Sequence, residues 1–187
     1  MKSPISVQPL GAEIWRQIRT EDWSHVMIGI GVPTSLWNFD TPYRSIGSWG
    51  GGGMGYGPPA SVGAALANKK YGRFSVAIQG DGDFMYSPGA LWTAAHHQIP
   101  LLMVMHNNRA YHQELMHIQR MGNRRNRGID RAHIGTALDD PAIDYATLAQ
   151  DDLDAMKDVN QRYFLCRFGW QCNRAMCRYR HLSGRLG

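Results

Sequence analysis

The sequence predicts an α/β fold with a parallel sheet, because two short apolar strands flank one helix. Residues 74–79 (FSVAIQ) and 101–105 (LLMVM) are apolar runs of the length that forms buried strands. Residues 90–97 form the helix between them, and the Ser-Pro-Gly of residues 87–89 supplies a serine able to cap it. A strand, helix and strand of this length make a right-handed parallel crossover. Both strands therefore end at the same edge of one sheet.

Each predicted strand ends in a short polar motif. Gly-Asp-Gly (residues 80–82) follows the first strand, and Asn-Asn (residues 107–108) follows the second. A carboxylate and an amide at adjacent strand ends are suitable ligands for a hard divalent cation that also carries a diphosphate. Ligands of open α/β sheets bind at the carboxyl ends of the strands, so we expect Asp81 and Asn108 to share one ion there. Gly-Asp-Gly alone would indicate no more than a turn.

The two motifs, in this order, resemble those of the thiamine diphosphate enzymes of the acetolactate synthase, pyruvate oxidase and benzoylformate decarboxylase type. A glycine-rich segment at residues 51–60 and the SVGAA of residues 61–65 add to the similarity, which spans residues 4–150. The resemblance implies the C-terminal diphosphate-binding domain alone. It implies a doubly wound parallel sheet with helices on both faces, which we expect to be truncated at its C-terminal end.

The resemblance also implies roles for individual residues around the diphosphate. Mg²⁺ is expected to be bound by the side chains of Asp81 and Asn108 and by the backbone carbonyl of Ala110, with diphosphate oxygens and water completing the octahedron. The backbone N–H groups of Gly82 and Asp83 are expected to bind the phosphates. Relatives often carry serine or alanine in place of Asp83, and a carboxylate beside a diphosphate is repulsive unless it points away.

The glycine-rich segment is expected to hold the other end of the cofactor. Met54 falls where the family places a bulky apolar residue that bends the cofactor, and the carbonyl of Gly52 and the N–H of Met54 would hold the pyrimidine ring. Without the surrounding glycines, Met54 would be interpreted as a core residue. The same glycines match G-x-G-x-x-G, but no good strand precedes them, so a dinucleotide site is not expected.

The implied activity is that of a lyase or transferase acting on a 2-oxo acid. A thiazolium ylide attacks the 2-oxo acid, CO₂ is lost, and the carbanion equivalent passes to an acceptor. In this family the activating glutamate comes from a separate, pyrimidine-binding domain, whereas 187 residues make about one domain. We therefore expect no catalytic residue on this chain, turnover only with a partner chain or a longer parent, and homo-oligomers in the parent enzyme.

The segment after the Asn-Asn motif carries two further sets of polar residues. His112 and Glu114 are candidates for facing the substrate, whereas the other histidines are interpreted as surface or loop residues. Five arginines between residues 120 and 131 indicate a solvated loop, a nucleic-acid surface, or a site that attracts an anionic 2-oxo acid or a coenzyme thioester. Of these interpretations, we do not favour a nucleic-acid surface. Residues 139–149 then resemble the family's D-P-x-x-D turn and predict a helix capped by Asp144.

Beyond residue 150 the chain changes character. Residues 151–187 carry seven Lys or Arg against four Asp, which gives +3 of the overall +5, and they show no clean strand alternation. We therefore divide the chain into an incomplete diphosphate-binding domain at residues 1–150 and an atypical basic, cysteine-containing tail at residues 151–187. The preferred interpretation is that the family resemblance ends here because the reading frame or the expressed segment does. The residues that remain are then a tail that is not part of the ancestral fold.

A zinc site in the tail is the alternative. Its candidate ligands are spaced as in CCCH zinc fingers, whose aromatic and arginine side chains stack on single-stranded RNA bases. These ligands are Cys166, Cys172, Cys177 and His181. The second function class is therefore a non-catalytic protein, either a degenerate cofactor fragment or a zinc-finger fusion that binds RNA.

Cysteine usage and hydropathy favour a cytoplasmic protein. The odd total of three cysteines, with none before residue 151, argues against a disulfide framework. The N-terminus lacks an apolar leader, and no stretch approaches the roughly 20 apolar residues of a membrane span. No membrane partner is expected.

Overall fold

A computed structural model describes residues 6–28, 34–47, 52–154 and 164–168, and the fold is given for these ranges. One sheet of parallel strands runs in the order β1-β2-β3-β4. The strands are β1 (Trp23–Ile28), β2 (Phe74–Gly80), β3 (Leu102–His106) and β4 (Phe164–Phe168). The helices are α1 (Val7–Ile18), α2 (Gly57–Lys69), α3 (Asp81–Phe84), α4 (Ala90–His96), α5 (His112–Arg124) and α6 (Tyr145–Asp154). Short 3₁₀ turns lie at Thr34–Leu36 and Pro42–Arg44.

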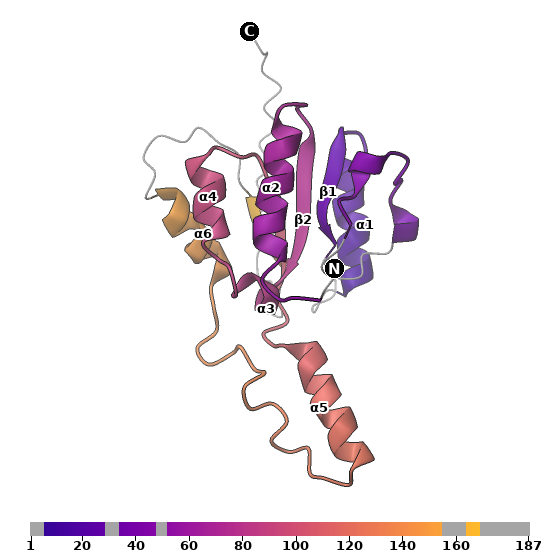
Figure 1. The fold of residues 1–187 in the computed structure, drawn as a ribbon, viewed down its shortest axis with the longest axis vertical. Coiled ribbons are helices and arrows are strands. Elements are labelled where there is room, and N and C mark those ends of the chain that lie inside the picture. The colour runs from indigo at the N-terminus through magenta and orange to yellow at the C-terminus, as the bar shows by residue number, and fades with distance from the viewer. Residues whose placement is uncertain (1–5, 29–33, 48–51, 155–163, 169–187) are drawn as a thin grey trace.

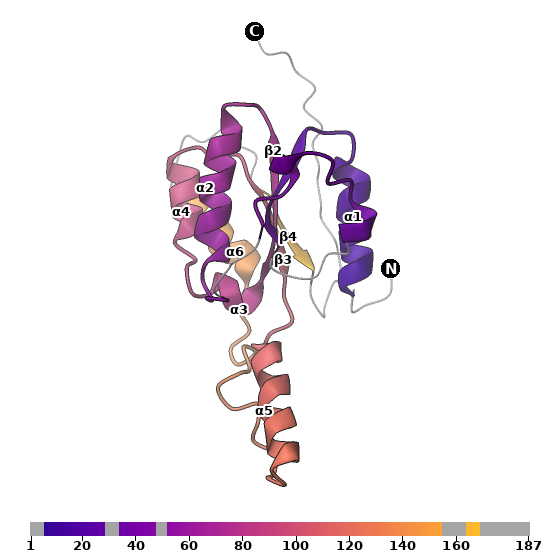
Figure 2. The same ribbon diagram turned by 45° about the vertical axis from the view of Figure 1, so that its right-hand side comes forward.

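Helices cover both faces of the sheet. Helices α2, α4 and α6 lie on one face and α1 lies on the other, as Figure 2 shows edge-on. The predicted doubly wound α/β fold is therefore confirmed. Helix α5 and the loop that joins it to α6 belong to neither layer and protrude beyond the carboxyl edge of the sheet (Figure 1). No helix within the described ranges has both the length and the apolar character needed to cross a membrane.

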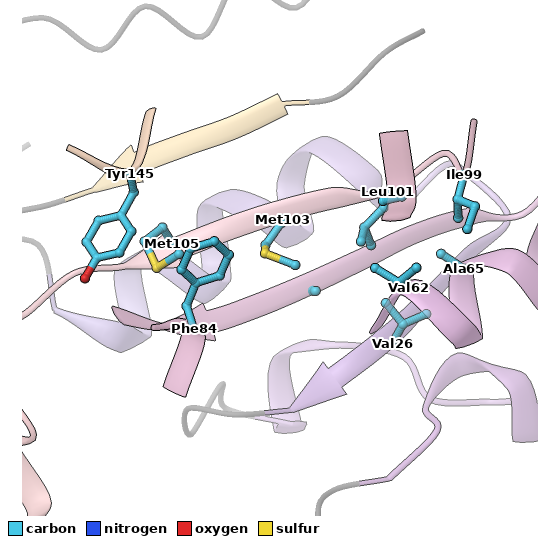
Figure 3. Close-up of a cluster of buried hydrophobic side chains, with 11 residues drawn as sticks. Val26, Val62, Ala65, Phe84, Ile99, Leu101, Met103, Met105 and Tyr145 are labelled. Carbon is cyan, nitrogen blue, oxygen red and sulfur yellow. The ribbon is translucent and has the colours of Figure 1, made fainter. Parts of the chain in front are cut away.

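Two hydrophobic clusters hold the layers together. The first joins the β strands to the α2, α4 and α6 layer, and Figure 3 shows its side chains, among them Phe84 and Tyr145 at the carboxyl end of the sheet. The second packs α1 against the other face and is dominated by tryptophan, with Trp23 of β1 against Trp15 and Trp37. Burial of large apolar side chains on both faces is what makes these strands form a continuous central layer.

The strands and helix predicted around the two polar motifs are confirmed within one residue at each end. β2 and β3 correspond to residues 74–79 and 101–105, and α4 corresponds to residues 90–97. Asp144 caps α6 as predicted, because its Oδ1 accepts hydrogen bonds from the N–H groups of Ala146 (3.1 Å) and Thr147 (3.3 Å). Ser87 does not cap α4. Its hydroxyl instead donates to the carbonyl of Gly55 at 2.8 Å, and α4 begins without a side-chain cap.

The expectation of no strand beyond residue 150 was wrong. β4 extends the sheet by pairing in parallel with β3, with Leu102 opposite Phe164 and His106 opposite Phe168. An unpaired strand edge leaves backbone N–H and C=O groups without partners, and a short apolar run suffices to satisfy them. Helix α6 also continues past residue 150, to Asp154. The interval of five residues was too short for its strand character to show in the hydropathy pattern.

A buried histidine makes the stability of the fold sensitive to acid. His25 of β1 is fully buried, contacts the ring of Trp37 edge-on at 5.1 Å, and has no hydrogen-bond partner on either ring nitrogen among the described residues. Burial lowers the pKa of His25 from 6.5 to about 4. Below pH 6.5 the unfolded chain binds a proton that the folded chain does not bind until near pH 4. The free energy of unfolding should therefore fall across this window, by about 3 kcal/mol in all.

Denaturant titrations at pH 7 and pH 5 would test this expectation. The His25→Phe variant, which keeps an aromatic ring beside Trp37, should lose much of the difference in unfolding free energy between the two pH values. His133→Gln is a matched control, because His133 is exposed and its substitution should leave that difference unchanged. An equal pH dependence in wild type and His25→Phe would contradict the assignment.

Candidate active site

The two polar motifs lie side by side at the carboxyl edge of the sheet. Gly80, the last residue of β2, pairs with His106, the last residue of β3, so Asp81 and Asn107 leave adjacent strands at the same level. Parallel pairing produces this arrangement directly, since both strands end at one edge. The predicted meeting of the two motifs is confirmed.

Asp81 is the most deeply buried carboxylate of this edge. It begins α3, is only 2% exposed, and lies near the backbone N–H groups of Gly82, Arg109 and Asn108. Burial raises the pKa of Asp81, and those N–H groups oppose the rise only in part. Its Oδ2 is buried without a hydrogen-bond partner among the described residues. A buried anionic oxygen of this kind favours a cation beside it.

The 107–110 segment folds into two tight side-chain turns. Asn107 Oδ1 accepts a hydrogen bond from the N–H of Arg109, and Asn108 Oδ1 accepts one from the N–H of Ala110, both at 3.0 Å. Arg109 takes a left-handed backbone conformation with φ of +58°. Asn108 is exposed, so an oxygen lone pair of its amide stays available to a ligand.

Residues 136–138 hold the 107–110 segment in place through backbone hydrogen bonds. The N–H of Tyr111 donates to the carbonyl of Thr136 at 2.8 Å, and the N–H of Leu138 donates to the carbonyl of Arg109 at 2.7 Å. These bonds close the base of the protrusion that contains α5. Asn108 and Ala110 therefore lie on a short segment whose two ends are fixed, one by β3 and one by residues 136–138.

Tyr111 and Tyr145 lie close to Gly82 and Asp81, Tyr86 contacts Tyr111, and sequence reasoning gave none of these tyrosines a role. A Cβ on Gly82 would lie 2.7 Å from the ring of Tyr111, which itself meets the ring of Tyr86 edge-on at 6.1 Å. Only glycine fits beneath that ring. Tyr145 lies on Phe84, and burial, followed by the charge of Asp81, raises its pKa. Tyr86 and Tyr111 have no motif around them, and the family resemblance of residues 139–149 predicts a helix but no contact between Tyr145 and Asp81.

Asp83 is turned toward the glycine-rich segment. Its Oδ1 accepts a hydrogen bond from the N–H of Gly55 at 2.5 Å, and its Oδ2 accepts one from Nε2 of the buried Gln79. Both carboxylate oxygens are therefore engaged by protein donors. Hydrogen bonds from these donors offset part of the repulsion between this carboxylate and a neighbouring anion.

The glycine-rich segment reaches the same edge through Gly55. Gly52 is exposed with a φ of +64°, and Met54 is 38% exposed. Met54 is therefore not a core residue, which removes the alternative interpretation of this side chain. Gly55 contacts Asp83 and Ser87, which follow the Gly-Asp-Gly motif. Met54 is the residue before Gly55 in the chain.

The remaining candidate residues lie on the protrusion beyond this edge, on β4, or outside the described ranges. His112 and Glu114 are exposed on the first turn of the protruding α5, and the arginines of residues 120–131 are exposed as well. Cys166 lies on β4, whereas Cys172, Cys177 and His181 lie outside the described residues. Within the described part of the chain, no cluster of three or more His, Cys, Asp or Glu side chains is arranged to bind a metal. A cation at Asp81 would thus rely on amide and carbonyl oxygens.

The fold and these motifs match known proteins. Residues 29–155 match the family model for the thiamine pyrophosphate enzyme, C-terminal TPP binding domain. The chain is 30% identical over 152 residues to the chloroplastic acetolactate synthase of Arabidopsis thaliana, covering 75% of this chain and 21% of that protein. It is 42% identical over 60 residues to benzoylformate decarboxylase of Pseudomonas aeruginosa, covering 32% of this chain and 11% of that protein.

A solved structure shows the same fold. The thiamine diphosphate-dependent 4-hydroxybenzoylformate decarboxylase of Rhodococcus jostii matches with a TM-score of 0.67 at 20% identity, over 91% of this chain and 34% of that chain. Across these three relatives the present chain covers between 11% and 34% of their length.

Proposed function

Because the chain belongs to the thiamine pyrophosphate enzyme family as a C-terminal TPP binding domain, we propose that it holds the diphosphate of TPP (thiamine diphosphate) through Mg²⁺. The proposed ligands are the side chains of Asp81 and Asn108 and the backbone carbonyl of Ala110. Carboxylate, amide and carbonyl oxygens suit a small cation that keeps part of its water shell and takes its remaining ligands from phosphate.

The observation that carries this proposal is the unpartnered Oδ2 of Asp81. The oxygen is buried at the carboxyl edge of the sheet, where the segment carrying Asn108 and Ala110 also lies. An ionised carboxylate in such a place is costly without a counter-charge, and a divalent cation supplies one. Asn108 supports the proposal because its exposed amide oxygen makes only a local turn contact.

The rest of the cofactor is proposed to lie between the two glycine-containing segments. The N–H groups of Gly82 and Asp83 would bind phosphate oxygens. The carbonyl of Gly52 and the N–H of Met54 would hold the pyrimidine ring, with the exposed side chain of Met54 against the cofactor. These residues bind and orient, and the bound group supplies the electron sink for chemistry at a 2-oxo acid.

We assign this domain to a 2-oxo acid decarboxylase or carboligase of the acetolactate synthase type. Turnover is proposed to require a separate pyrimidine-binding domain that supplies the activating glutamate. The relatives named acetolactate synthase and benzoylformate decarboxylase support this class, and their greater length leaves room for further domains. A homo-oligomeric parent enzyme and a cytoplasmic location complete the proposal.

Calorimetric titration of thiamine diphosphate into the purified chain tests the metal-dependent site. Saturable binding is expected with Mg²⁺ present, and chelation with EDTA should abolish it, because the diphosphate and Asp81 would then face each other as two anions. Thiamine, which lacks the diphosphate, is the matched control ligand and should bind far more weakly. Equal affinity with and without Mg²⁺ would contradict the metal assignment, and no binding of thiamine diphosphate under either condition would contradict the proposed function.

A further inference from the structure

Gly55 is fixed at both of its backbone polar groups by side chains from the segment after β2. Its N–H donates to Asp83 Oδ1 at 2.5 Å, and its carbonyl accepts from Ser87 Oγ at 2.8 Å. The fit is close, because a Cβ on Gly55 would lie 2.7 Å from Cβ of Tyr86 and the backbone has a φ of +85°. The glycine-rich segment is thus attached to the chain that carries the Gly-Asp-Gly motif.

The same carboxylate is anchored on its other side. Asp83 Oδ2 accepts a hydrogen bond from Nε2 of Gln79, which is fully buried on β2. Gly57, the first residue of α2, lies against this pair so closely that a Cβ there would overlap both side chains. Strand β2, helix α3, the glycine-rich segment and the start of α2 therefore meet at one side chain. Asp83 cannot turn to another rotamer without losing both donors.

We propose that Asp83 is a positioning residue that fixes the glycine-rich segment, and with it Met54, relative to Asp81 before any cofactor is bound. This proposal rests on the proposed function, because its consequence is that Met54 is already in position to contact the cofactor. Glycine-rich chain loses more conformational freedom on ordering than any other, so a segment left free would have to be ordered during binding. Hydrogen bonds to a charged acceptor are among the stronger ones and suit this task.

Hydrogen exchange on the cofactor-free protein tests the positioning directly. The amide of Gly55 should exchange at least about tenfold faster in Asp83→Ala than in wild type, since its acceptor is gone. Asp83→Asn should restore most of the protection, because its amide oxygen can accept from Gly55 while Gln79 rotates to accept from its NH₂ group. Asp130→Ala is the matched control, an acid removed from an exposed site on the protrusion. Unchanged protection of Gly55 in Asp83→Ala would overturn the proposal.

Binding titrations with two ligands separate positioning from a general loss of structure. With Mg²⁺, Asp83→Ala should weaken thiamine diphosphate by about tenfold, while inorganic diphosphate, which does not reach Met54, should bind as well as to wild type or more tightly. An equal loss for both ligands would overturn the proposal. Failure of wild type to bind either ligand would refute the proposed function, and the exchange experiment would still decide whether Asp83 fixes the segment.

Circular dichroism establishes that each variant is folded. Should Asp83→Ala not fold, Asp83→Leu decides the matter, because leucine fills the space of the aspartate but cannot accept a hydrogen bond from the N–H of Gly55. Ser87→Ala removes only the contact to the Gly55 carbonyl and should raise exchange across residues 52–57 while leaving the Asp83 contact in place. Wild-type protection of Gly55 in Asp83→Leu would overturn the proposal, whereas faster exchange of Gly55 in Asp83→Leu than in Ser87→Ala would support it.

Discussion

Asp81→Asn is expected to abolish Mg²⁺-dependent binding of thiamine diphosphate while leaving the cofactor-free domain at least as stable as wild type. Loss of residues that merely support a metal ligand costs 10–100-fold in affinity, so loss of the charged ligand itself should cost about 100-fold or more. The stability effect has the opposite sign. Burial raises the pKa of Asp81 above its ordinary value of 3.8, so the folded state disfavours the charged form of this carboxylate.

The pH dependence of this effect follows from the raised pKa. As the pH rises past 3.8, the unfolded chain releases the proton of Asp81 more readily than the folded chain, and the free energy of unfolding falls until the folded pKa is passed. Asparagine has no proton to release and should remove this fall. The expected result at pH 7 without metal is therefore a melting temperature equal to or above that of wild type.

Calorimetry and thermal melts on the same preparations measure both halves of the expectation. Asp130→Asn is the matched control, since that carboxylate is exposed and its substitution should change neither quantity. A variant at position 81 that still binds thiamine diphosphate in a Mg²⁺-dependent way would remove Asp81 from the ligand set. A clear loss of stability in metal-free Asp81→Asn would show that the carboxylate stabilises the fold, contrary to this expectation.

Trp23→Ala should be the most damaging change to the fold. Trp23 is 1% exposed and meets the rings of Trp15, Trp37 and Phe39 edge-on at 5.5, 5.3 and 5.4 Å. The guanidinium of Arg44 lies 4.6 Å from its ring. Truncating a buried tryptophan removes its transfer free energy and leaves a cavity, which lowers the free energy of unfolding by about 3–5 kcal/mol.

Urea denaturation followed by far-ultraviolet circular dichroism measures this loss. Trp92→Ala is the matched control, because Trp92 is half exposed on α4 and stacks on His96 at 4.8 Å, so it should lower the free energy of unfolding far less. Similar losses in the two variants would mean that the tryptophan cluster does not stabilise the α1 face. Since β1 pairs with β2, a domain destabilised at Trp23 should also lose order at Asp81.

The part of the fold that sequence reasoning predicted is the part whose signals are local. β2, β3 and α4 follow from short apolar runs bounded by Gly and Pro, and the Asp144 cap follows from a side chain that bonds its own neighbours. The placement of Asp81 beside the Asn-Asn motif follows from parallel pairing alone. Each of these inferences needs only a few consecutive residues and one topological rule.

The part that was missed depends on contacts between distant segments. Asp83 contacts Gly55, Tyr111 covers Gly82, and Trp23 packs on Trp37, and no local pattern announces any of the three. Ser87 was interpreted as a helix cap because the residues around it suit that role. Its hydroxyl instead donates to the carbonyl of Gly55, which lies far earlier in the sequence. β4 was not predicted because its strand conformation depends mainly on pairing with β3 and not on its own sequence pattern.

The all-parallel sheet also bears on how the chain reaches its native state. No two of its described strands are joined by a hairpin, so every strand pair must close a long loop before it gains contacts. The smallest of these loops joins β2 to β3 and contains α3 and α4, and the strand that it leads into, β3, ends just before the Asn-Asn motif. A nucleus built from this unit would bring Asp81 and Asn108 together before β1, β4 or the tryptophan cluster is in place. The residues proposed to bind the cofactor would then be among the earliest parts of the molecule to assemble.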